Sequence, residues 1–202
     1  MTVAPELRDY LDELVRRLAA VVDLDAVYLF GSAAQGAYEH GRSDVDVIAV
    51  TARPSTREEK EALAAAAESL PCPARKLELV VYARGAERHE LNVNTGELVH
   101  FDAGDDPEFW FVLDRAIAEQ GVVPLLGPPW EEVFGPVPRS DVLDALEQAV
   151  DWQERDDPVG RSSVLNACRA WMWLETGRWG TKADAARWLR QRVRVAIAEA
   201  RA

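Results

Sequence analysis

The residues best suited to chemistry lie at the ends of two short apolar runs in the first fifty positions. Gly31-Ser32 directly follows the apolar run Ala26–Phe30, and Ser43-Asp44-Val45-Asp46 opens the next run. A glycine and a serine at the end of a buried strand let the backbone turn closely around a phosphate, to which the hydroxyl and nearby amides can donate. The carboxylates of Asp44 and Asp46, at i and i+2 of a strand, share one face about 7 Å apart.

Two carboxylates that converge on one face repel each other, and a bound divalent cation removes that penalty. Mg²⁺ favours one or two carboxylates together with the phosphate oxygens of a substrate. Metal ions of this kind neutralise the charge that develops during nucleotidyl transfer. The pattern therefore predicts a phosphate-transfer site, although an Asp-x-Asp pair alone is also typical of a solvated strand end.

Glu78 can supply the base that this chemistry needs. It is the only carboxylate in the expected strand Lys76–Tyr82, where Leu77, Leu79 and Val81 alternate with the residues of the other face. If that strand lies beside Val45–Val50, Glu78 completes a triad with Asp44 and Asp46. There it could ligate a metal, accept the proton of an attacking hydroxyl, or do both. An exposed strand carboxylate is the alternative.

The elements that must position these residues alternate between strands and helices up to about residue 127. Periodicity and capping signals predict helices at 5–22, 55–70 (with a capping box Ser55-x-x-Glu58) and 107–120, and strands at 26–30, 45–50, 76–82 and 97–101. After a proline-rich stretch, only helices are expected, at 140–155, 162–176 and 182–201, the last capped by Thr181-x-x-Asp184. We expect an α/β (α+β) domain with a small mixed sheet at residues 1–127, followed by an all-α helical domain at 128–202.

The composition limits the kinds of ligand and the cellular location that we expect for this protein. The net charge of −12 argues against a nucleic-acid partner and favours cationic or small neutral ligands. No apolar run is long enough to span a membrane, and four carboxylates among the first twenty residues exclude a secretory leader, so we expect a cytoplasmic protein, most simply a monomer. Cys72 and Cys168 are expected to be small buried residues, and His40, His89 and His100 to lie on the surface or in loops.

The motif residues resemble a known family. Gly31-Ser32-x-x-x-Gly36 followed by Ser43-Asp44-x-Asp46 is similar to the signature of the DNA polymerase β-like nucleotidyltransferases. A longer likeness, over residues 110–129, 134–138 and 164–188, resembles the aminoglycoside 3″-adenylyltransferases, which modify streptomycin and spectinomycin. The segment 91–104 is not similar to those antibiotic enzymes.

The resemblance implies a site in the cleft between a nucleotidyltransferase domain and a helical bundle, where ATP and the drug bind. Asp44, Asp46 and Glu78 would hold Mg²⁺, with Glu78 as the base. By the same likeness the nucleotide-binding residues would be Gly31, Ser32, Ser43, Arg169 and Lys182, the last two thirteen positions apart (182 − 169). Trp152 and Asp157 would contact a streptomycin-type acceptor; core packing is the alternative for Trp152, and solvated helix charges are the alternatives for Arg169 and Lys182.

These features predict a Mg²⁺-dependent enzyme that transfers AMP from ATP to a hydroxyl of a small cationic acceptor, first of all an aminoglycoside or aminocyclitol antibiotic. Two alternatives stay open. One is the same chemistry on a protein acceptor, as in antitoxin-type nucleotidyltransferases. The other is a non-catalytic module that binds the nucleotide or the antibiotic.

Overall fold

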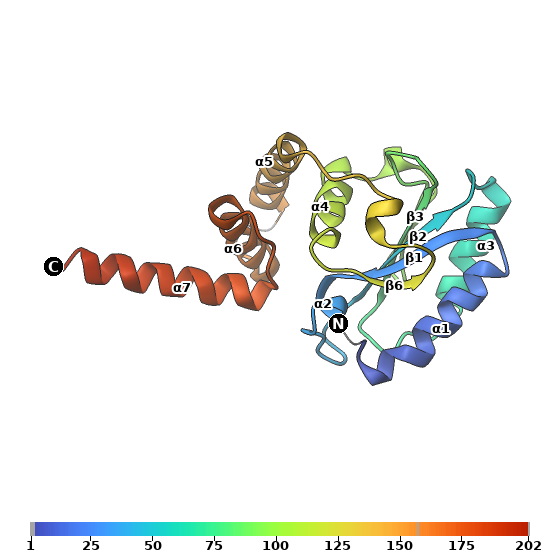
Figure 1. Cartoon of the computed structure of the whole chain (residues 1–202), viewed down its shortest axis with the longest axis horizontal. Helices are drawn as coiled ribbons and strands as arrows, with labels where there is room; N and C mark the ends of the chain where they lie inside the picture. The colour runs from blue at the N-terminus through green and yellow to red at the C-terminus, as the bar shows by residue number, and fades with distance from the viewer. Residues whose placement is uncertain (1–2, 157, 202) are drawn as a thin grey trace. The chain divides into compact units, whose positions relative to one another are not determined.

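The computed structural model describes residues 3–156 and 158–201. This part of the chain divides into two compact units, Met1–Pro138 and Arg139–Ala202. The first unit holds a mixed sheet with helices and the second is helical (Figure 1), which confirms the predicted fold class. Residues 128–138 belong to the sheet unit here, and the domain boundary expected at residue 127 stays a prediction.

Six strands form the sheet, in the order β5-β4-β3-β2-β1-β6. Their bounds are Leu24–Phe30 (β1), Val45–Thr51 (β2), Leu77–Ala83 (β3), Leu91–Asn94 (β4), Leu98–His100 (β5) and Val123–Leu126 (β6). β2 and β3 pair in parallel, and the other neighbours pair antiparallel. A parallel pair needs a crossover, which the chain makes through helix α3 (Arg57–Glu68).

One face of the sheet is covered by α1 (Pro5–Ala19) and α3. The leucines of α1 recur at helical spacing and are 0–1% exposed: Leu7, Leu11, Leu14 and Leu18. They form one apolar cluster with Leu63 of α3 and with alternate strand residues that include Val45, Val47, Leu77 and Leu79. The predicted alternation of the third strand is confirmed.

The opposite face is covered by α4 (Glu108–Ala118) and by the short 3₁₀ helix η2 (Trp130–Glu132). Val80 and Tyr82 of β3 belong to this second cluster, with Phe111 of α4 and Trp130 of η2. The Tyr28 hydroxyl donates to the carbonyl oxygen of Pro128 over 2.8 Å, which fixes the chain that follows β6. Polar residues at the start of β2 or β3 on this face therefore lie on the α4 side.

Local structure differs from the sequence analysis in three places. The strands β4 and β6 were not predicted; β6 contains Pro124, which removes a backbone donor and is tolerated at the edge of a sheet. The predicted capping box Ser55-x-x-Glu58 is wrong by one residue, because Thr56 and Glu59 make the reciprocal cap of α3. The Ser55 hydroxyl instead donates to Glu90 over 2.6 Å.

A buried histidine and an aspartate connect the β3–β4 loop to the start of α4. His89 lies in the β3–β4 loop, one of the two expected places, but it is buried there, at 5% exposed. Its Nε2 lies 3.2 Å from Asp106 Oδ2, and its ring stacks on Phe111 with 3.7 Å between centroids. Asp106 follows the 3₁₀ helix η1 (Ala103–Asp105) and also contacts His100 Nδ1 at 2.9 Å. Desolvation lowers the pKa of His89 more than the Asp106 carboxylate raises it.

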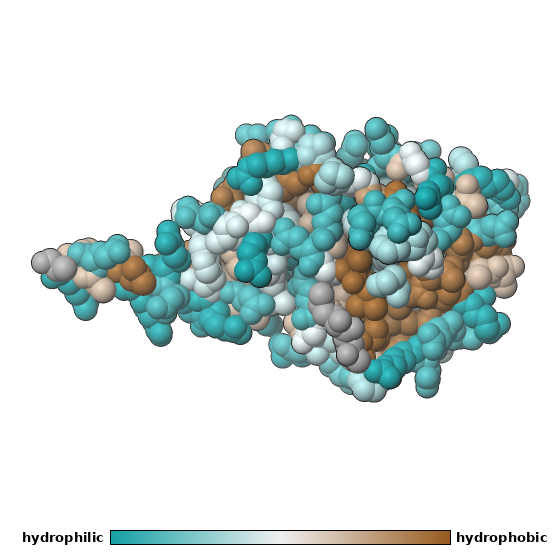
Figure 2. All heavy atoms as spheres, in the orientation of Figure 1, coloured by the Kyte–Doolittle hydropathy of each residue, from teal (hydrophilic) through white to brown (hydrophobic). Residues whose placement is uncertain are grey.

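The helical unit consists of α5 (Arg139–Asp156), α6 (Arg161–Thr176) and α7 (Lys182–Glu199). Gly177, at φ 69°, ends α6, and the side chain of Thr181 accepts the N–H of Asp184, which confirms the predicted cap of α7. Figure 2 shows a mostly hydrophilic visible surface along α7 with an apolar patch near its end, where α7 exposes Val193, Val195 and Ile197.

Two further findings concern the cysteines and the apolar character of the helices. Cys72 and Cys168 are free and half-buried, rather than buried as expected. None of the helices in the part of the chain that the structure describes is both long and apolar enough to cross a membrane.

Candidate active site

The parallel pair β2–β3 places two of the predicted acidic residues side by side. Asp46 is directly opposite Glu78 in the register of the pair, and opposite Phe30 on the other side. Because successive side chains of a strand alternate between faces, Asp46 and Glu78 point to the same side as Ile48 and Val80, the face that α4 covers. The predicted neighbourhood of the two strands is confirmed.

Gly31 makes room for the Asp46 carboxylate. It follows β1 directly, begins the single-turn helix α2 (Gly31–Ala34) and has a φ of +65°. A Cβ added to Gly31 would lie 2.0 Å from Oδ2 of Asp46, far inside van der Waals contact. A glycine is therefore required here both by its backbone conformation and by the carboxylate that lies against it.

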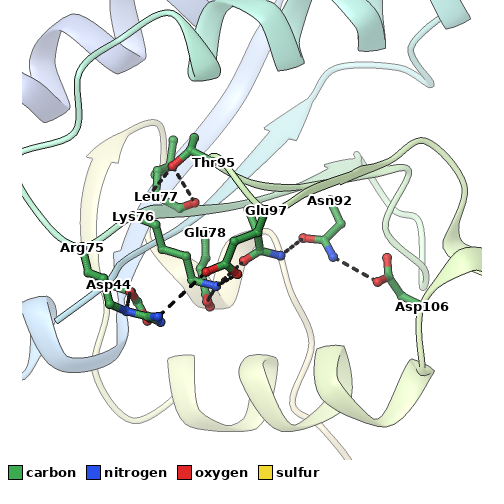
Figure 3. A network of polar contacts seen from close by, with 10 residues as sticks. Asp44, Arg75, Lys76, Leu77, Glu78, Asn92, Thr95, Glu97 and Asp106 are labelled. Atoms are coloured by element: carbon green, nitrogen blue, oxygen red, sulfur yellow. Dashed lines mark hydrogen bonds and ion pairs between the residues drawn. The ribbon is translucent and has the colours of Figure 1, made fainter. Parts of the chain in front are cut away.

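Asp44 precedes β2 and is held by an arginine. Arg75 donates to Oδ1 and Oδ2 of Asp44 over 2.8 and 2.7 Å, in the fork geometry that guanidinium and carboxylate favour. The hydrogen bonds to Asp44 raise the pKa of Arg75, against the opposing effect of desolvation. Figure 3 shows this pair beside Lys76 and Glu78.

Lys76 is the second cation at the site, and it is buried. Its Nζ lies 2.8 Å from Oε1 of Glu78 and 2.6 Å from Oε2 of Glu97, and it donates to Asn94 Oδ1 over 3.3 Å (Figure 3). Desolvation is the largest single influence on this ammonium and lowers its pKa. The hydrogen bonds and charges of Glu78 and Glu97 together outweigh it, so the pKa of Lys76 is raised.

The three carboxylates are not gathered into one metal-binding group. Within residues 3–156 and 158–201, no three His, Cys, Asp or Glu side chains lie together in a way that could hold a metal ion. The physical reason is that Asp44 pairs with Arg75 and Glu78 pairs with Lys76. The chemistry of these side chains nevertheless fits Mg²⁺, because carboxylate oxygens are the hard ligands that it prefers. Asp46 and Glu78 are opposite each other in the strand register, and the missing side chain of Gly31 leaves space for the Asp46 carboxylate.

The predicted serines lie in the turn segments near the carboxylates. Ser32 is in α2, and its carbonyl oxygen accepts the N–H of Ala37 over 2.9 Å. Ser43 precedes Asp44, and its hydroxyl oxygen accepts the N–H of Glu39 over 3.0 Å. Both residues thus shape the loop between α2 and β2, and their contact with a nucleotide stays a prediction.

The remaining predicted residues belong to the helical unit. Arg169 of α6 donates through Nε to the carbonyl oxygen of Gly180 over 3.0 Å, and its guanidinium lies 5.7 Å from the ring centroid of Trp179. Lys182, exposed, begins α7, and Trp152 is half-buried in α5. Asp157 lies outside the described residues. The roles of all four residues stay predictions.

Sequence reasoning missed four charged or amide side chains that surround Asp44 and Glu78. Arg75, Lys76, Asn94 and Glu97 contact Asp44 or Glu78, directly or through one another. One signal was available: Lys76 and Glu78 are at i and i+2 of the expected strand and so share its face. Asn94 could not be found in this way, because β4 was not predicted, and the contact of Glu97 with Lys76 joins two expected strands whose pairing a local pattern does not give.

Comparisons with known proteins show which enzymes the chain is similar to. A family profile described as "Nucleotidyltransferase domain" matches residues 6–102, and one described as "Aminoglycoside adenylyltransferase, C-terminal domain" matches residues 132–202. Proteins named aminoglycoside (3″) (9) adenylyltransferase from Klebsiella pneumoniae, Shigella flexneri and Escherichia coli are 29% identical over 217 aligned positions, covering 95% of this chain and 79% of theirs. The crystal structure of spectinomycin adenyltransferase AAD(9) from Enterococcus faecialis, with ATP and spectinomycin, has a TM-score of 0.65 and 19% identity, over 86% of this chain and 79% of that one.

The mixed sheet, its acidic strand ends and the first of these matches define the protein as a nucleotidyltransferase. The second match and the curated relatives narrow the class further. The chain is similar to aminoglycoside adenylyltransferases over 95% of its length, and its residues 132–202 match the C-terminal domain of that family.

Proposed function

We propose that the protein transfers AMP from ATP to a hydroxyl group of a cationic aminoglycoside or aminocyclitol antibiotic, of the streptomycin or spectinomycin type. The observation that supports this best is the pairing of Asp46 with Glu78 across β2 and β3, with Asp44 two residues before Asp46. The names of the relatives and the bound molecules of the AAD(9) structure support the substrate class. The net charge of −12 favours a cationic acceptor.

In the proposed reaction, the acceptor oxygen attacks the α-phosphorus of ATP and pyrophosphate leaves. Glu78 accepts the proton of the attacking hydroxyl. Asp44, Asp46 and Glu78 are the residues that would hold Mg²⁺, which when bound neutralises negative charge on the triphosphate. Gly31, Ser32 and Ser43 bind the triphosphate.

The helical unit supplies the remaining contacts of the proposal. Arg169 and Lys182 bind the nucleotide through their positive charges. Trp152 and Asp157 bind the acceptor, because an aromatic face beside a carboxylate suits a polycationic ring system. ATP is the co-substrate and Mg²⁺ the cofactor.

A pyrophosphate-release assay on the full chain tests the proposal. With ATP and Mg²⁺, streptomycin, spectinomycin or a related compound should release pyrophosphate and gain the mass of an adenylyl group. Glu78→Gln should reduce kcat by about 100- to 10,000-fold, as removal of a general base does. Asp46→Asn should also abolish turnover, whereas Asp12→Asn, at an exposed position of α1, serves as the control and should retain it.

Three outcomes would contradict the proposal. Near-normal turnover in Asp44→Asn, Asp46→Asn or Glu78→Gln would remove the assigned site. Transfer of labelled AMP to protein rather than to a small molecule would favour the antitoxin-type alternative. ATP binding without pyrophosphate release, for every acceptor tried, would favour a non-catalytic module.

A further inference from the structure

The strongest unassigned feature near the site is Lys76. Its side chain is 10% exposed, although an ammonium is costly to remove from water. It lies one residue before β3, two positions before Glu78, and on the same side of the strand as Glu78. The packing of apolar side chains does not explain why a charged side chain is buried at this position.

The backbone on both sides of Lys76 is fixed. Its carbonyl oxygen accepts the N–H of Val45 at the start of β2 over 3.0 Å. The next residue, Leu77, donates its N–H to the Thr95 hydroxyl over 3.0 Å, and its carbonyl oxygen accepts the N–H of Thr95 over 3.0 Å. Lys76 therefore reaches Glu78 from a rigid anchor that joins β2, β3 and the β4–β5 turn.

The Lys76 ammonium has three oxygen partners in this network: Asn94 and Glu97 accept hydrogen bonds from it, and Glu78 forms an ion pair with it. The partner atoms are Glu78 Oε1 at 2.8 Å, Glu97 Oε2 at 2.6 Å and Asn94 Oδ1 at 3.3 Å. Two of its three donors are hydrogen-bonded to the β4–β5 turn and its charge is paired with Glu78, so the ammonium is directed to these side chains and not to a substrate phosphate. The contacts describe a residue that acts on Glu78 rather than on the nucleotide.

We propose that Lys76 is a positioning residue for Glu78, and that Glu97 and Asn94 at the β4–β5 turn hold Lys76 in place for this task. The inference rests on the proposed function, because it assigns to Glu78 the role of base. By binding Oε1, Lys76 restricts the rotamers of Glu78 and keeps its carboxylate near the start of β2, where Asp46 lies opposite Glu78. Figure 3 shows the side chains of Lys76 and Glu78, at the start of β3, together with that of Glu97 in the β4–β5 turn.

The stability of the fold gives an independent expectation. Removing one partner of a buried ion pair is destabilising chiefly because it leaves the other charge buried and uncompensated. Here the partners that Lys76 would leave behind are accessible to water, since Glu78 is 38% and Glu97 51% exposed at the side chain. The variant Lys76→Met should therefore fold normally and lose activity, a combination that a merely structural lysine would not give.

A kinetic double-mutant cycle between Lys76 and Glu78 tests the inference on the full chain. With ATP and an acceptor that the wild type modifies, Lys76→Met should lower kcat by about 10- to 100-fold, as misplacement of a reacting group does, with the KM for ATP nearly unchanged. Lys76→Arg should recover part of the loss. In the Glu78→Gln background, Lys76→Met should have no further effect. Lys60→Met is the matched control, because Lys60 is a half-buried lysine on α3 whose Nζ donates to the Phe101 carbonyl.

A second arm uses Glu97, which keeps the test decisive if Lys76→Met does not fold. Glu97→Gln leaves the Lys76–Glu78 pair in place and should lower kcat less than Lys76→Met does, again without changing the KM for ATP. Wild-type kcat in Lys76→Met, or an equal loss on top of Glu78→Gln, would overturn the inference while the proposed function stands. A wild type without turnover on any acceptor would overturn both.

Discussion

At the scale of single residues, the site depends on a backbone conformation that one glycine supplies. Gly31 combines a positive φ with direct contact between its Cα region and the Asp46 carboxylate. Gly85 provides a natural comparison, because its φ of +76° is similar but nothing lies within 4 Å of an added Cβ. The two glycines separate the effect of backbone strain from the effect of crowding at the site.

Gly31→Ala and Gly85→Ala should therefore carry a similar backbone strain but differ strongly in enzymatic activity. Each change forces an L-residue into the left-handed region, at a cost of about 1–2 kcal/mol. Only Gly31→Ala also displaces the Asp46 carboxylate, so it should abolish adenylyl transfer, and Gly85→Ala should retain it. Urea unfolding and the pyrophosphate assay on both variants check this expectation. Equal loss of activity in the two variants would contradict the steric argument.

At the scale of elements, the start of α3 shows how far sequence signals reach. A capping box was predicted at the correct helix, but two hydroxyl residues stand next to each other, Ser55 and Thr56, and the sequence does not say which one caps. The structure selects Thr56 because Ser55 is engaged by Glu90, a residue 35 positions away. Such long-range contacts are invisible to local patterns.

Thr56→Ala should lower the free energy of unfolding by about 1 kcal/mol, the usual cost of removing an N-cap side chain. Thr56→Ser keeps the hydroxyl that accepts the Glu59 N–H and should leave stability nearly unchanged. Chemical denaturation of both variants measures the difference. If Thr56→Ala were as stable as Thr56→Ser, the cap would contribute nothing.

His89 makes the sheet unit sensitive to acid. Desolvation lowers its pKa in the folded state, so the unfolded chain binds the proton more readily. Stability attributable to this residue is present above about pH 6.5 and falls as the pH drops below that value, by at most about 1.4 kcal/mol per pH unit. Asp106 and Asp102, which raise its pKa, moderate the effect, whereas Arg88, which lowers it, strengthens it.

His89→Gln should flatten this part of the pH dependence, and His40→Gln, at an exposed position, should leave it as in the wild type. Urea denaturation at several pH values on both sides of about 6.5 provides the measurement. An identical pH slope in His89→Gln and in the wild type would assign the acid sensitivity to other groups.

Much of the sheet and its site was predictable, and the exceptions have physical causes. Alternation in β3 and the apolar run of β2 gave the strands that carry Asp46 and Glu78. The edge strand β6 contains Pro124, which argues against a strand in any local pattern. The burial of the loop residue His89 could not be predicted, because neither its packing against Phe111 nor its contact with Asp106 leaves a trace in the neighbouring residues.

At the scale of the whole molecule, the net charge of −12 predicts how an acceptor arrives. A negative field attracts a cationic antibiotic, and salt screens this attraction. As ionic strength rises from about 0.01 M to about 0.15 M, the screening length falls from about 30 Å to about 8 Å, and kcat/KM for a cationic acceptor should fall several-fold. The value of kcat at saturating acceptor should change little.

Steady-state kinetics at several salt concentrations, with the Mg²⁺ and ATP concentrations held fixed, check this expectation. An acceptor kcat/KM that is independent of salt would show that the field of the protein does not guide the encounter.

The parallel register of β2 and β3 also sets which changes of chain length the enzyme can accept. Glu78 faces Asp46 because of its place in an alternating row, so one residue inserted between Leu77 and Glu78 would turn the carboxylate into the apolar layer beneath α1 and α3. One residue inserted in the connection between α3 and β3 would leave that alternation intact. The site therefore depends on which alternate positions of the strand carry the acidic residues. Two chains with one added residue each would have equal length, and only the one with the residue outside the strand would keep Glu78 opposite Asp46.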